Sequence, residues 1–379
     1  MILIKNGHVI DPLNDIDEVT DVLVDGSRIE KIGKDLPGYD YNTVDATGCI
    51  VTPGLVDHHA HIWPLANIGL PAASACFGAG VTTVVDAGSS GPATYHMYRP
   101  YLDLEKVRVK AYLNVCTTGL ASLPTPEDIA PDHISEAKIM DCFDKYGDEL
   151  LGLKIRTSKF IVKDMGFEPL KKTISIAEKL GVSIMVHSTD PAGEFSELLE
   201  LLRPGDVLTH MYMNKGSNLI SDGKVLEAAF KARERGILFE AADAREHFGL
   251  DVAETAIAQG FLPDFIATDL THLSMHLRPT SFNMAMQISK YTALGISLKD
   301  AIKMATVNPA KHMGMLDKIG SLTVGHPADI AVFRPVEKEN VFGDRPFGNP
   351  DQKTVTGNLV YQNVLTIKDG EMVHRDVTF

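Results

Sequence analysis

From residue 51 to residue 318, short apolar segments alternate with amphipathic helical segments, and this alternation most constrains the fold. Helix-like segments such as residues 170–181 and 222–236 separate the apolar ones, and Gly181 and Gly236 stand where helix C-caps are expected. Units of this kind at a spacing of roughly 25–45 residues are typical of a (β/α)8 barrel. The apolar segments are residues 55–58, 82–86, 107–115, 150–155, 183–186, 206–209, 237–240 and 264–267.

An open, doubly wound sheet is the competing arrangement for the same alternation. Such a sheet normally carries a glycine-rich phosphate-binding turn after its first strand, and none follows residues 55–58. The Gly-Ser-Ser-Gly run at residues 88–91 lacks phosphate-loop spacing, although it could leave room for a ligand. We therefore predict an α/β protein with a TIM barrel.

The two chain ends have a different composition, with short strands and turns such as Asp25-Gly26 but no helical stretch. The tail includes TIKDGEMVH, which is typical of a hairpin. We expect both ends to pair into one small β-sandwich, formed by residues 1–50 with 319–379, beside a barrel of residues 51–318. The expected strands are residues 2–5, 21–24, 29–32, 43–45, 329–333 and 359–361.

The net charge of the chain indicates which classes of binding partner to expect. The 379 residues carry a net charge of −14, from 36 basic and 50 acidic side chains. Nucleic acid and anionic membranes both need a basic patch, so we expect neither as a partner and expect a small-molecule substrate instead. No leader pattern and no apolar run of eighteen residues is present, so we expect a soluble, cytoplasmic protein.

The cysteines are scattered, with no CxxC pair. This spacing disfavours a thiolate zinc site and a disulfide framework. The four cysteines are Cys49, Cys76, Cys116 and Cys142.

The strongest local signal is PGLVDHHAHI at residues 53–62. His59 and His61 are two positions apart, so on a strand their side chains leave the same face. At the carboxyl end of a first barrel strand that face looks into the active-site mouth, where two imidazoles can share one metal ion. Asp57 lies one step deeper on the same face and could orient a ligand. An HxH pair alone also occurs without function, so the prediction of a metal site depends on residues at the ends of the other strands.

Three further polar residues directly follow apolar strands: His187 after SIMV, His210 after DVLT and Asp269 after FIAT. One such residue by itself is more often a satisfied polar side chain or a helix N-cap than a ligand. Because the carboxyl ends of barrel strands meet at one mouth, three of them together with HxH indicate a metal site.

Lys154, in LLGLKIRTS, is expected at the same mouth. An ammonium there would be repelled by metal ions and costly to desolvate. A neutral lysine amine can instead add CO2 and become a carbamate, whose two oxygens can bridge two cations. The residues alone leave a second interpretation open, in which Lys154 pairs with Asp269 or Glu240 inside the barrel.

The chain resembles the amidohydrolase superfamily over nearly its whole length. The resemblance rests on IKNGHVID, on VDATGCIVTPGLVDHHAHI, and on ATVNPAKHMGM with IGSLTVGHPADIAVF. It implies two divalent metal ions, for which we expect zinc, with manganese, cobalt or iron as alternatives at such nitrogen and oxygen ligands. The implied ligands are His59 and His61 on the more buried metal, His187 and His210 on the more exposed metal, carboxylated Lys154 as the bridge, and Asp269.

The same resemblance implies a hydrolytic mechanism. Metal charge lowers the pKa of a bound water towards about 7, and this water attacks the substrate carbonyl. Asp269 would accept the water proton and deliver it to the leaving nitrogen or oxygen. Arg156, two residues beyond Lys154, would share its face and could stabilise the oxyanion or bind a substrate carboxylate. The alternative is an arginine that turns outwards to a surface acid.

Four other residues are weaker candidates. His247 follows strand seven and could contact the substrate, although a histidine in a loop is more often only exposed. His272 and His276 have a spacing that binds metal on a helix, but with one ligand set already complete we expect them in a loop wall. Tyr212 either contacts the substrate or packs.

Two residues reduce the range of possible substrate classes. Adenosine-deaminase-like members of the superfamily lack a bridging lysine, so Lys154 argues against that branch. Dihydroorotases carry HxHxR, with the arginine on the substrate carboxylate, whereas the third position here is Trp63. VTTVVDAGSSGP and GLKIR are most similar to the amidohydrolase/deacetylase metallohydrolases of the dihydroorotase-like branch. This resemblance implies removal of an acetyl group from a small, anionic N- or O-acetylated acid, such as an N-acetyl-D-amino acid or an acetylated 2-hydroxy acid.

Three alternatives remain open at this point. A cyclic-amide hydrolase of the hydantoinase or dihydroorotase type comes first, and a deaminase is less favoured. A non-catalytic assembly protein would have lost metal ligands, whereas all six positions are filled here. The sequence is compatible with a homo-oligomer and does not decide the oligomeric state.

Overall fold

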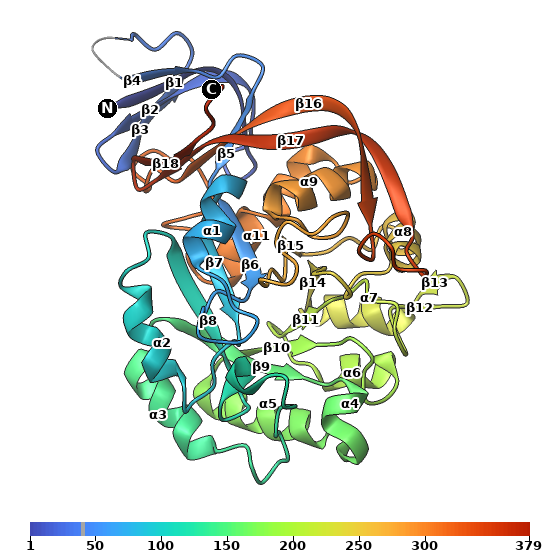
Figure 1. Cartoon of the computed structure of the whole chain (residues 1–379). Coiled ribbons are helices and arrows are strands. Elements are labelled where there is room, and N and C mark those ends of the chain that lie inside the picture. The colour runs from blue at the N-terminus through green and yellow to red at the C-terminus, as the bar shows by residue number, and fades with distance from the viewer. Residues whose placement is uncertain (39–41) are drawn as a thin grey trace.

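A computed structural model of the chain describes residues 1–38 and 42–379. Figure 1 shows two parts, a barrel built from the middle of the chain and a sheet that contains strands from both ends. The predicted fold class, a (β/α)8 barrel with a β domain formed by both chain ends, is confirmed.

The barrel sheet has eight parallel strands in sequence order. It closes between its last and first strands, where Ala60 bridges to Leu270 and the Asp269 amide donates to the His59 carbonyl at 2.7 Å. These strands are apolar runs because a sheet covered on one face by helices and filled on the other has no solvent face. The strands are β6 (Leu55–Ala60), β7 (Val81–Ala87), β8 (Arg108–Asn114), β9 (Leu150–Arg156), β10 (Ser183–His187), β11 (Val207–Thr209), β14 (Leu238–Ala242) and β15 (Phe265–Ala267).

Helices lie outside the barrel strands (Figure 1). In α5 the apolar residues form one buried stripe, and Gly181 ends the helix in the left-handed conformation with φ 69°, as predicted. The α-helices are α1 (Ala72–Cys76), α2 (Tyr95–Leu102), α3 (Glu136–Tyr146), α4 (Lys159–Val162), α5 (Glu168–Leu180), α6 (Phe195–Leu201), α7 (Glu227–Glu234), α8 (Leu250–Ala258), α9 (Met284–Ala293), α10 (Leu298–Met304) and α11 (Val307–His312). Short 3-10 helices are η1 (Phe77–Ala79), η2 (Gly119–Ser122) and η3 (Lys163–Met165).

The helix expected over residues 222–236 begins only at Glu227, so its predicted start is wrong. The preceding residues form a small hairpin instead. Asp222 and Gly223 both have positive φ, at 49° and 72°, which is the geometry that Asp-Gly favours in a two-residue hairpin turn. The hairpin strands are β12 (Ile220–Ser221) and β13 (Lys224–Val225).

The two chain ends share one eight-stranded mixed sheet with its own apolar core. The join is at β5, whose residues pair antiparallel with Ile330–Phe333 on one side and parallel with β1 on the other. The division of the chain at residues 50 and 319 stays a proposal. The strands are β1 (Ile2–Asp11), β2 (Ile16–Asp25), β3 (Arg28–Gly33), β4 (Asn42–Asp45), β5 (Ile50–Pro53), β16 (Ile330–Gly343), β17 (Thr354–Lys368) and β18 (Glu371–Arg375).

The C-terminal strands are much longer than predicted, with 14 residues in β16 and 15 in β17. Their far halves leave the end sheet and form a ribbon over α9 (Figure 1). The Tyr361 amide donates to the Ser289 hydroxyl at 3.0 Å and ties the ribbon to that helix. Sequence periodicity missed this extension because the ribbon residues are mostly polar and partly exposed.

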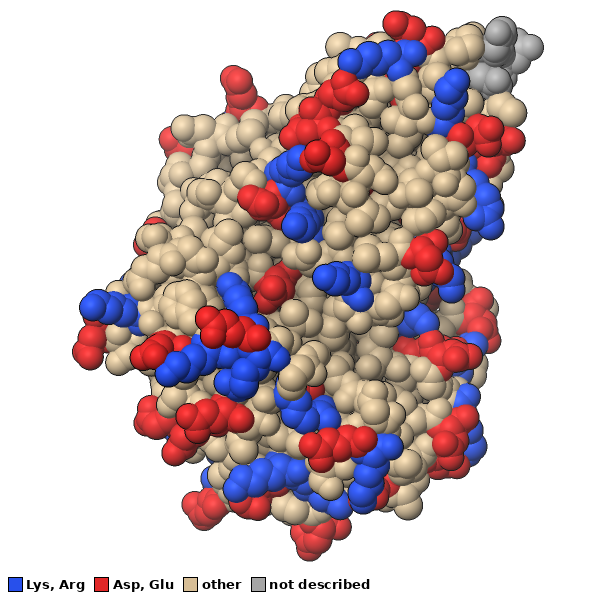
Figure 2. Space-filling view, turned by 180° about the vertical axis from the view of Figure 1, so that it is seen from behind, with Lys and Arg blue, Asp and Glu red and all other residues tan. Residues whose placement is uncertain are grey.

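Acidic and basic side chains are interspersed over the face seen in Figure 2. Among the residues that the structure describes, no helix is both long enough and apolar enough to cross a bilayer.

Candidate metal centre

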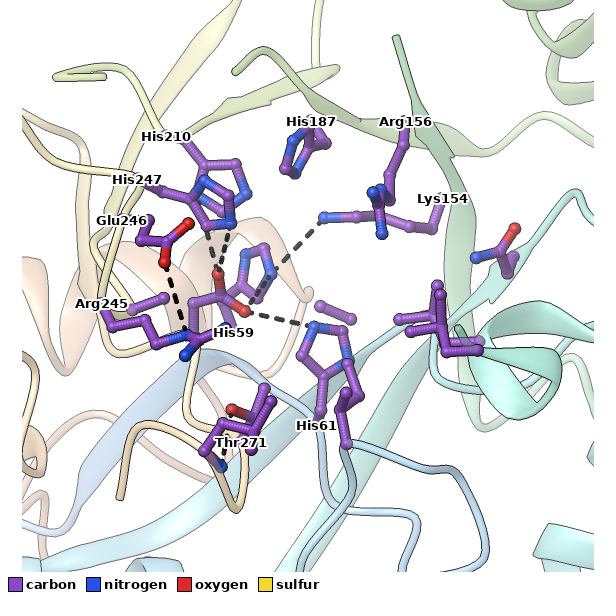
Figure 3. A pocket seen from close by; sticks show the side chains of 18 residues that line it. His59, His61, Lys154, Arg156, His187, His210, Arg245, Glu246, His247 and Thr271 are labelled. Atoms are coloured by element: carbon purple, nitrogen blue, oxygen red, sulfur yellow. Dashed lines mark hydrogen bonds and ion pairs between the residues drawn. The ribbon is translucent and has the colours of Figure 1, made fainter. Parts of the chain in front are cut away.

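A cavity of about 210 Å³ opens at the carboxyl ends of the barrel strands (Figure 3). A loop after β14 forms one side of it, through Arg245, Glu246 and His247. Every residue that the sequence implied as a metal ligand lines this cavity, as does Arg156: His59, His61, Lys154, His187, His210 and Asp269.

Two of these residues have unusual backbone conformations. His210 has φ 69° and Asp269 has φ 53°, a left-handed region that non-glycine residues rarely adopt. Such conformations persist where the surrounding structure over-determines them, and they concentrate at functional sites.

His59 and His61 have their outer ring nitrogens occupied by partners. His59 Nδ1 donates to Glu240 Oε1 at 2.9 Å, and His61 Nδ1 lies 2.9 Å from the Ser89 hydroxyl. Their Nε2 atoms lie 3.4 and 3.2 Å from Asp269 Oδ1 inside the cavity. Partners that fix one ring nitrogen and leave the other as a ligand are typical of metal-binding histidines.

His187 and His210 lie across the cavity, with ring centroids 4.5 Å apart. His210 Nδ1 donates to the Ala242 carbonyl at 2.6 Å, which leaves its Nε2 free to accept. Burial lowers the pKa of His59, His187 and His210 well below the ordinary value. The rings are therefore neutral, which is the form that binds a metal ion.

Lys154 is 2% exposed and reaches the centre of the cavity. Its Nζ lies 3.5 Å from His59 Nε2, and no carboxylate forms an ion pair with it within the described part of the chain. The alternative pairing with Asp269 or Glu240 is therefore not observed. Burial also lowers the pKa of Lys154 to about 8, which makes the neutral amine more accessible than in an ordinary lysine.

Gly88 gives Lys154 its space. A Cβ atom at Gly88 would lie 2.6 Å from Lys154 Cγ, and the residue has φ 83°. The room left by the Gly-Ser-Ser-Gly run is thus filled by the lysine side chain, and the adjacent Ser89 contacts His61.

Arg156 lies on the cavity wall with its Nη1 3.4 Å from Glu127 Oε2. Glu127 is 5% exposed, and burial raises its pKa although Arg156 opposes this. Sequence reasoning missed Glu127 because it stands in an irregular loop without any periodic signal. Arg156 points into the cavity and does not turn outwards to a surface acid (Figure 3).

His247 is more deeply involved than its loop position indicated. Its ring centroid lies 4.4 Å from that of His210 and 4.9 Å from that of His187. Sequence reasoning treated it as a substrate contact because no strand ends at this position.

The other weak candidates lie away from the reactive centre. Tyr212 packs in the core, and its hydroxyl donates to the Phe261 carbonyl. Trp63 is 2% exposed and packs against Tyr98. In the loop after Asp269, Thr271 and Leu273 line the cavity, whereas His272 is exposed and His276 packs against Phe282.

The barrel and its donor cluster are features of a class of barrel hydrolases. The sequence model of the Amidohydrolase family matches residues 50–360, and the chain belongs to this family. The resemblance drawn from the sequence is confirmed, and the chain is a hydrolytic enzyme.

Individual relatives carry several names. The chain is 35% identical over 328 residues to an Agrobacterium fabrum protein named deacetylase, an alignment that covers 84% of this chain and 79% of the relative. A solved structure described as a dihydroorotase is 30% identical with a TM-score of 0.88, covering 99% of this chain and 100% of the other. A structure described as an adenine deaminase has a TM-score of 0.87 at 24% identity, covering 98% of both chains, and shows the shared fold.

Proposed function

We propose that the chain is a binuclear metal-dependent hydrolase that removes an acetyl group from a small N- or O-acetylated acid. The observation that supports this most is the convergence of six potential metal ligands from five barrel strands on one small cavity. The name of the relative from Agrobacterium fabrum, deacetylase, supports the acetyl group as the part removed.

The donor chemistry fits two divalent cations. Neutral imidazoles whose other nitrogen is held by a partner need only a metal to complete their coordination. Lys154 fits as well, because a buried ammonium without a carboxylate partner is costly, whereas its carbamate would supply a bridging anion. Zinc suits these nitrogen and oxygen ligands. The proposed ligands are His59 and His61 on one ion, His187 and His210 on the other, carboxylated Lys154 between them, and Asp269.

When bound, such metal ions activate water and polarise a carbonyl group. Asp269 then has the position of a proton carrier. Its carboxylate is 5% exposed, faces the cavity and lies within 3.4 Å of both His59 Nε2 and His61 Nε2. It can accept a proton from the attacking water and return it to the leaving nitrogen or oxygen.

Arg156 is proposed to bind the carboxylate of the substrate. A guanidinium has five N–H donors, and the ion pair with Glu127 occupies only one nitrogen of Arg156. Its Nε has no hydrogen-bond partner among the described residues. The cavity volume of about 210 Å³ lies below the range usual for drug-sized ligands, which supports a small acid as substrate.

The test is acetate release from a panel of N-acetyl-D- and L-amino acids and O-acetyl 2-hydroxy acids. We expect at least one to be hydrolysed in a reaction that a chelator stops and added zinc restores. A panel without any metal-dependent acetate release would contradict the proposal.

A second candidate is cyclic-amide hydrolysis, favoured by the 30% identity to a solved structure described as a dihydroorotase. Against it, position 63 holds a buried tryptophan and no arginine. Dihydropyrimidines and hydantoins offered to the same metal-loaded enzyme separate the two candidates.

A further inference from the structure

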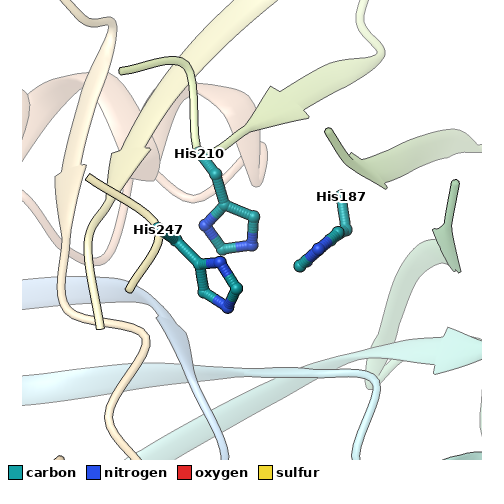
Figure 4. Close-up of side chains that lie close together, drawn as sticks. All are labelled: His187, His210 and His247. Atoms are coloured by element: carbon teal, nitrogen blue, oxygen red, sulfur yellow. The ribbon is translucent and has the colours of Figure 1, made fainter. Parts of the chain in front are cut away.

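Three histidines form a compact cluster on the more exposed side of the cavity (Figure 4). The ring centroids of His187, His210 and His247 are 4.4 to 4.9 Å apart in every pair. Each ring offers one nitrogen, and the three nitrogens lie within 4.8 Å of one another. Two of these residues are already proposed as metal ligands, whereas His247 has been considered only as a possible substrate contact.

The ring of His247 has one nitrogen held and one free. Its Nδ1 lies 3.0 Å from the Thr189 hydroxyl. Its Nε2 lies on the cavity side, 3.9 Å from Asp269 Oδ2. His210 has the same arrangement, with Nδ1 fixed by the Ala242 carbonyl. A ring fixed through one nitrogen presents the other in a defined direction, as metal-binding histidines do.

The loop that carries His247 is anchored at its base by a buried hydrogen-bond network. The buried carboxylate of Asp243 pairs with Lys290, accepts from Tyr291 at 2.9 Å and accepts from Gln287 at 2.8 Å. The His247 amide donates to the Asp243 carbonyl at 3.0 Å. His247 is therefore held against the other two rings by a buried network at the base of its loop.

We propose that His247 is a third histidine ligand at the more exposed metal position, and that this position can bind a divalent ion without the carbamate of Lys154. The inference rests on the proposed binuclear function. Three neutral imidazoles with one open position are an established ligand set for a catalytic zinc ion. In a tetrahedral zinc site, ligand nitrogens are roughly 3.3 Å apart, so modest rotation of the three rings suffices.

The experiment measures metal binding and needs no substrate. Metal-free protein is titrated with Co²⁺ against a chelating dye, in buffer free of bicarbonate and in buffer containing it. In the wild type we expect the exposed position to fill in both buffers. In His247→Ala we expect affinity at one position to fall by about 100-fold or more without bicarbonate, because loss of an outer-shell partner alone costs 10- to 100-fold. Bicarbonate should restore part of that affinity, since it permits the Lys154 carbamate to form.

His272→Ala is the matched control, because it removes an exposed histidine from the neighbouring loop and should leave both affinities unchanged. Circular dichroism of each metal-free variant establishes that it is folded. In the Co²⁺ form, the absorption bands of the exposed position should change in His247→Ala and stay unchanged in His272→Ala.

The outcomes separate the two proposals. If His247→Ala binds both ions with wild-type affinity in both buffers, His247 is not a metal ligand and the inference is wrong. If the wild type binds no divalent ion at all, the proposed function itself fails.

Discussion

The two sides of the donor cluster are held in different ways. On the buried side, His59 is fixed by the carboxylate of Glu240, and its side chain is 1% exposed. On the other side, His210 is fixed by a backbone carbonyl, and His247 by the hydroxyl of Thr189 with 27% of its side chain exposed.

This difference predicts different roles for the two sides, metal retention on the buried side and substrate contact on the exposed side. Glu240 is fully buried and contacts two neighbouring rings, those of His58 and His59, so we expect the ring of His59 to be the more rigid and the buried side to hold its metal more tightly. The exposed side borders Arg156, which is paired in register with His187 on the neighbouring strand. Substrate should therefore meet the protein mainly on that side.

Lys154→Ala should have the largest effect, because Lys154 lies between the two sides. In the proposed centre the variant removes the carbamate, which is the ligand shared by the two ions. Several kcal/mol of transition-state stabilisation by metal charge corresponds to a loss of about 1000-fold in kcat/KM. A carbamate signal in ¹³C NMR of protein supplied with labelled bicarbonate should be present in the wild type and absent in the variant.

Lys159→Ala removes an exposed lysine near the mouth and serves as its control. Full activity in Lys154→Ala would show that no lysine carbamate joins the two sides.

Arg156→Gln tests the exposed side as the substrate-binding side. A hydrogen bond to a charged group contributes about 1.5–3 kcal/mol, so we expect KM for an acetylated acid to rise by about 10- to 100-fold. The methyl ester of the same acid lacks the carboxylate and should lose far less. Equal losses for acid and ester would place the role of Arg156 elsewhere, for example at the oxyanion.

The residues proposed as ligands could be selected from the sequence because each is a local signal. His187, His210 and Asp269 directly follow short apolar strands, and in a barrel all such positions converge. Because the predicted barrel brings these strand ends together, the separate residues could be combined into one predicted site. The same local logic explains the success of the hairpin at Asp369-Gly370, where β17 and β18 pair on either side of the turn.

The groups that hold the ligands were not predictable in the same way. Glu240 contacts His59 from 181 residues away, and Thr189 contacts His247 from 58 residues away. No period or spacing encodes such a pair, since it depends on how the barrel closes and where its loops turn. His247 itself was undervalued for this reason, and the packing of Trp63 against Tyr98 was not foreseen either.

Glu240→Gln should weaken the buried side selectively. The carboxylate accepts from both His58 and His59, and an amide has only one oxygen to offer. Loss of such an outer partner typically lowers metal affinity by about 10- to 100-fold. Competition with a chelating dye should show this loss at the tighter position alone.

Glu246→Gln is the matched control for Glu240→Gln, because it removes a negative charge from the cavity wall at a side chain that is 60% exposed. If both variants lose metal affinity equally, the loss is due to the change in overall charge. The contact of Glu240 with His59 then does not specifically stabilise the buried side.

Thr189→Val should have the smallest effect and completes the comparison on the exposed side. The shape of the side chain is kept and one neutral hydrogen bond to His247 is lost, which costs about 0.5–1.5 kcal/mol, or about 2- to 10-fold in metal affinity. In a His247→Ala background the same substitution should have no effect, because its partner is already gone. An equal effect in both backgrounds would show that Thr189 acts on the site by a route other than His247. A larger effect than that of Glu240→Gln would reverse the order of rigidity that the two sets of partners predict.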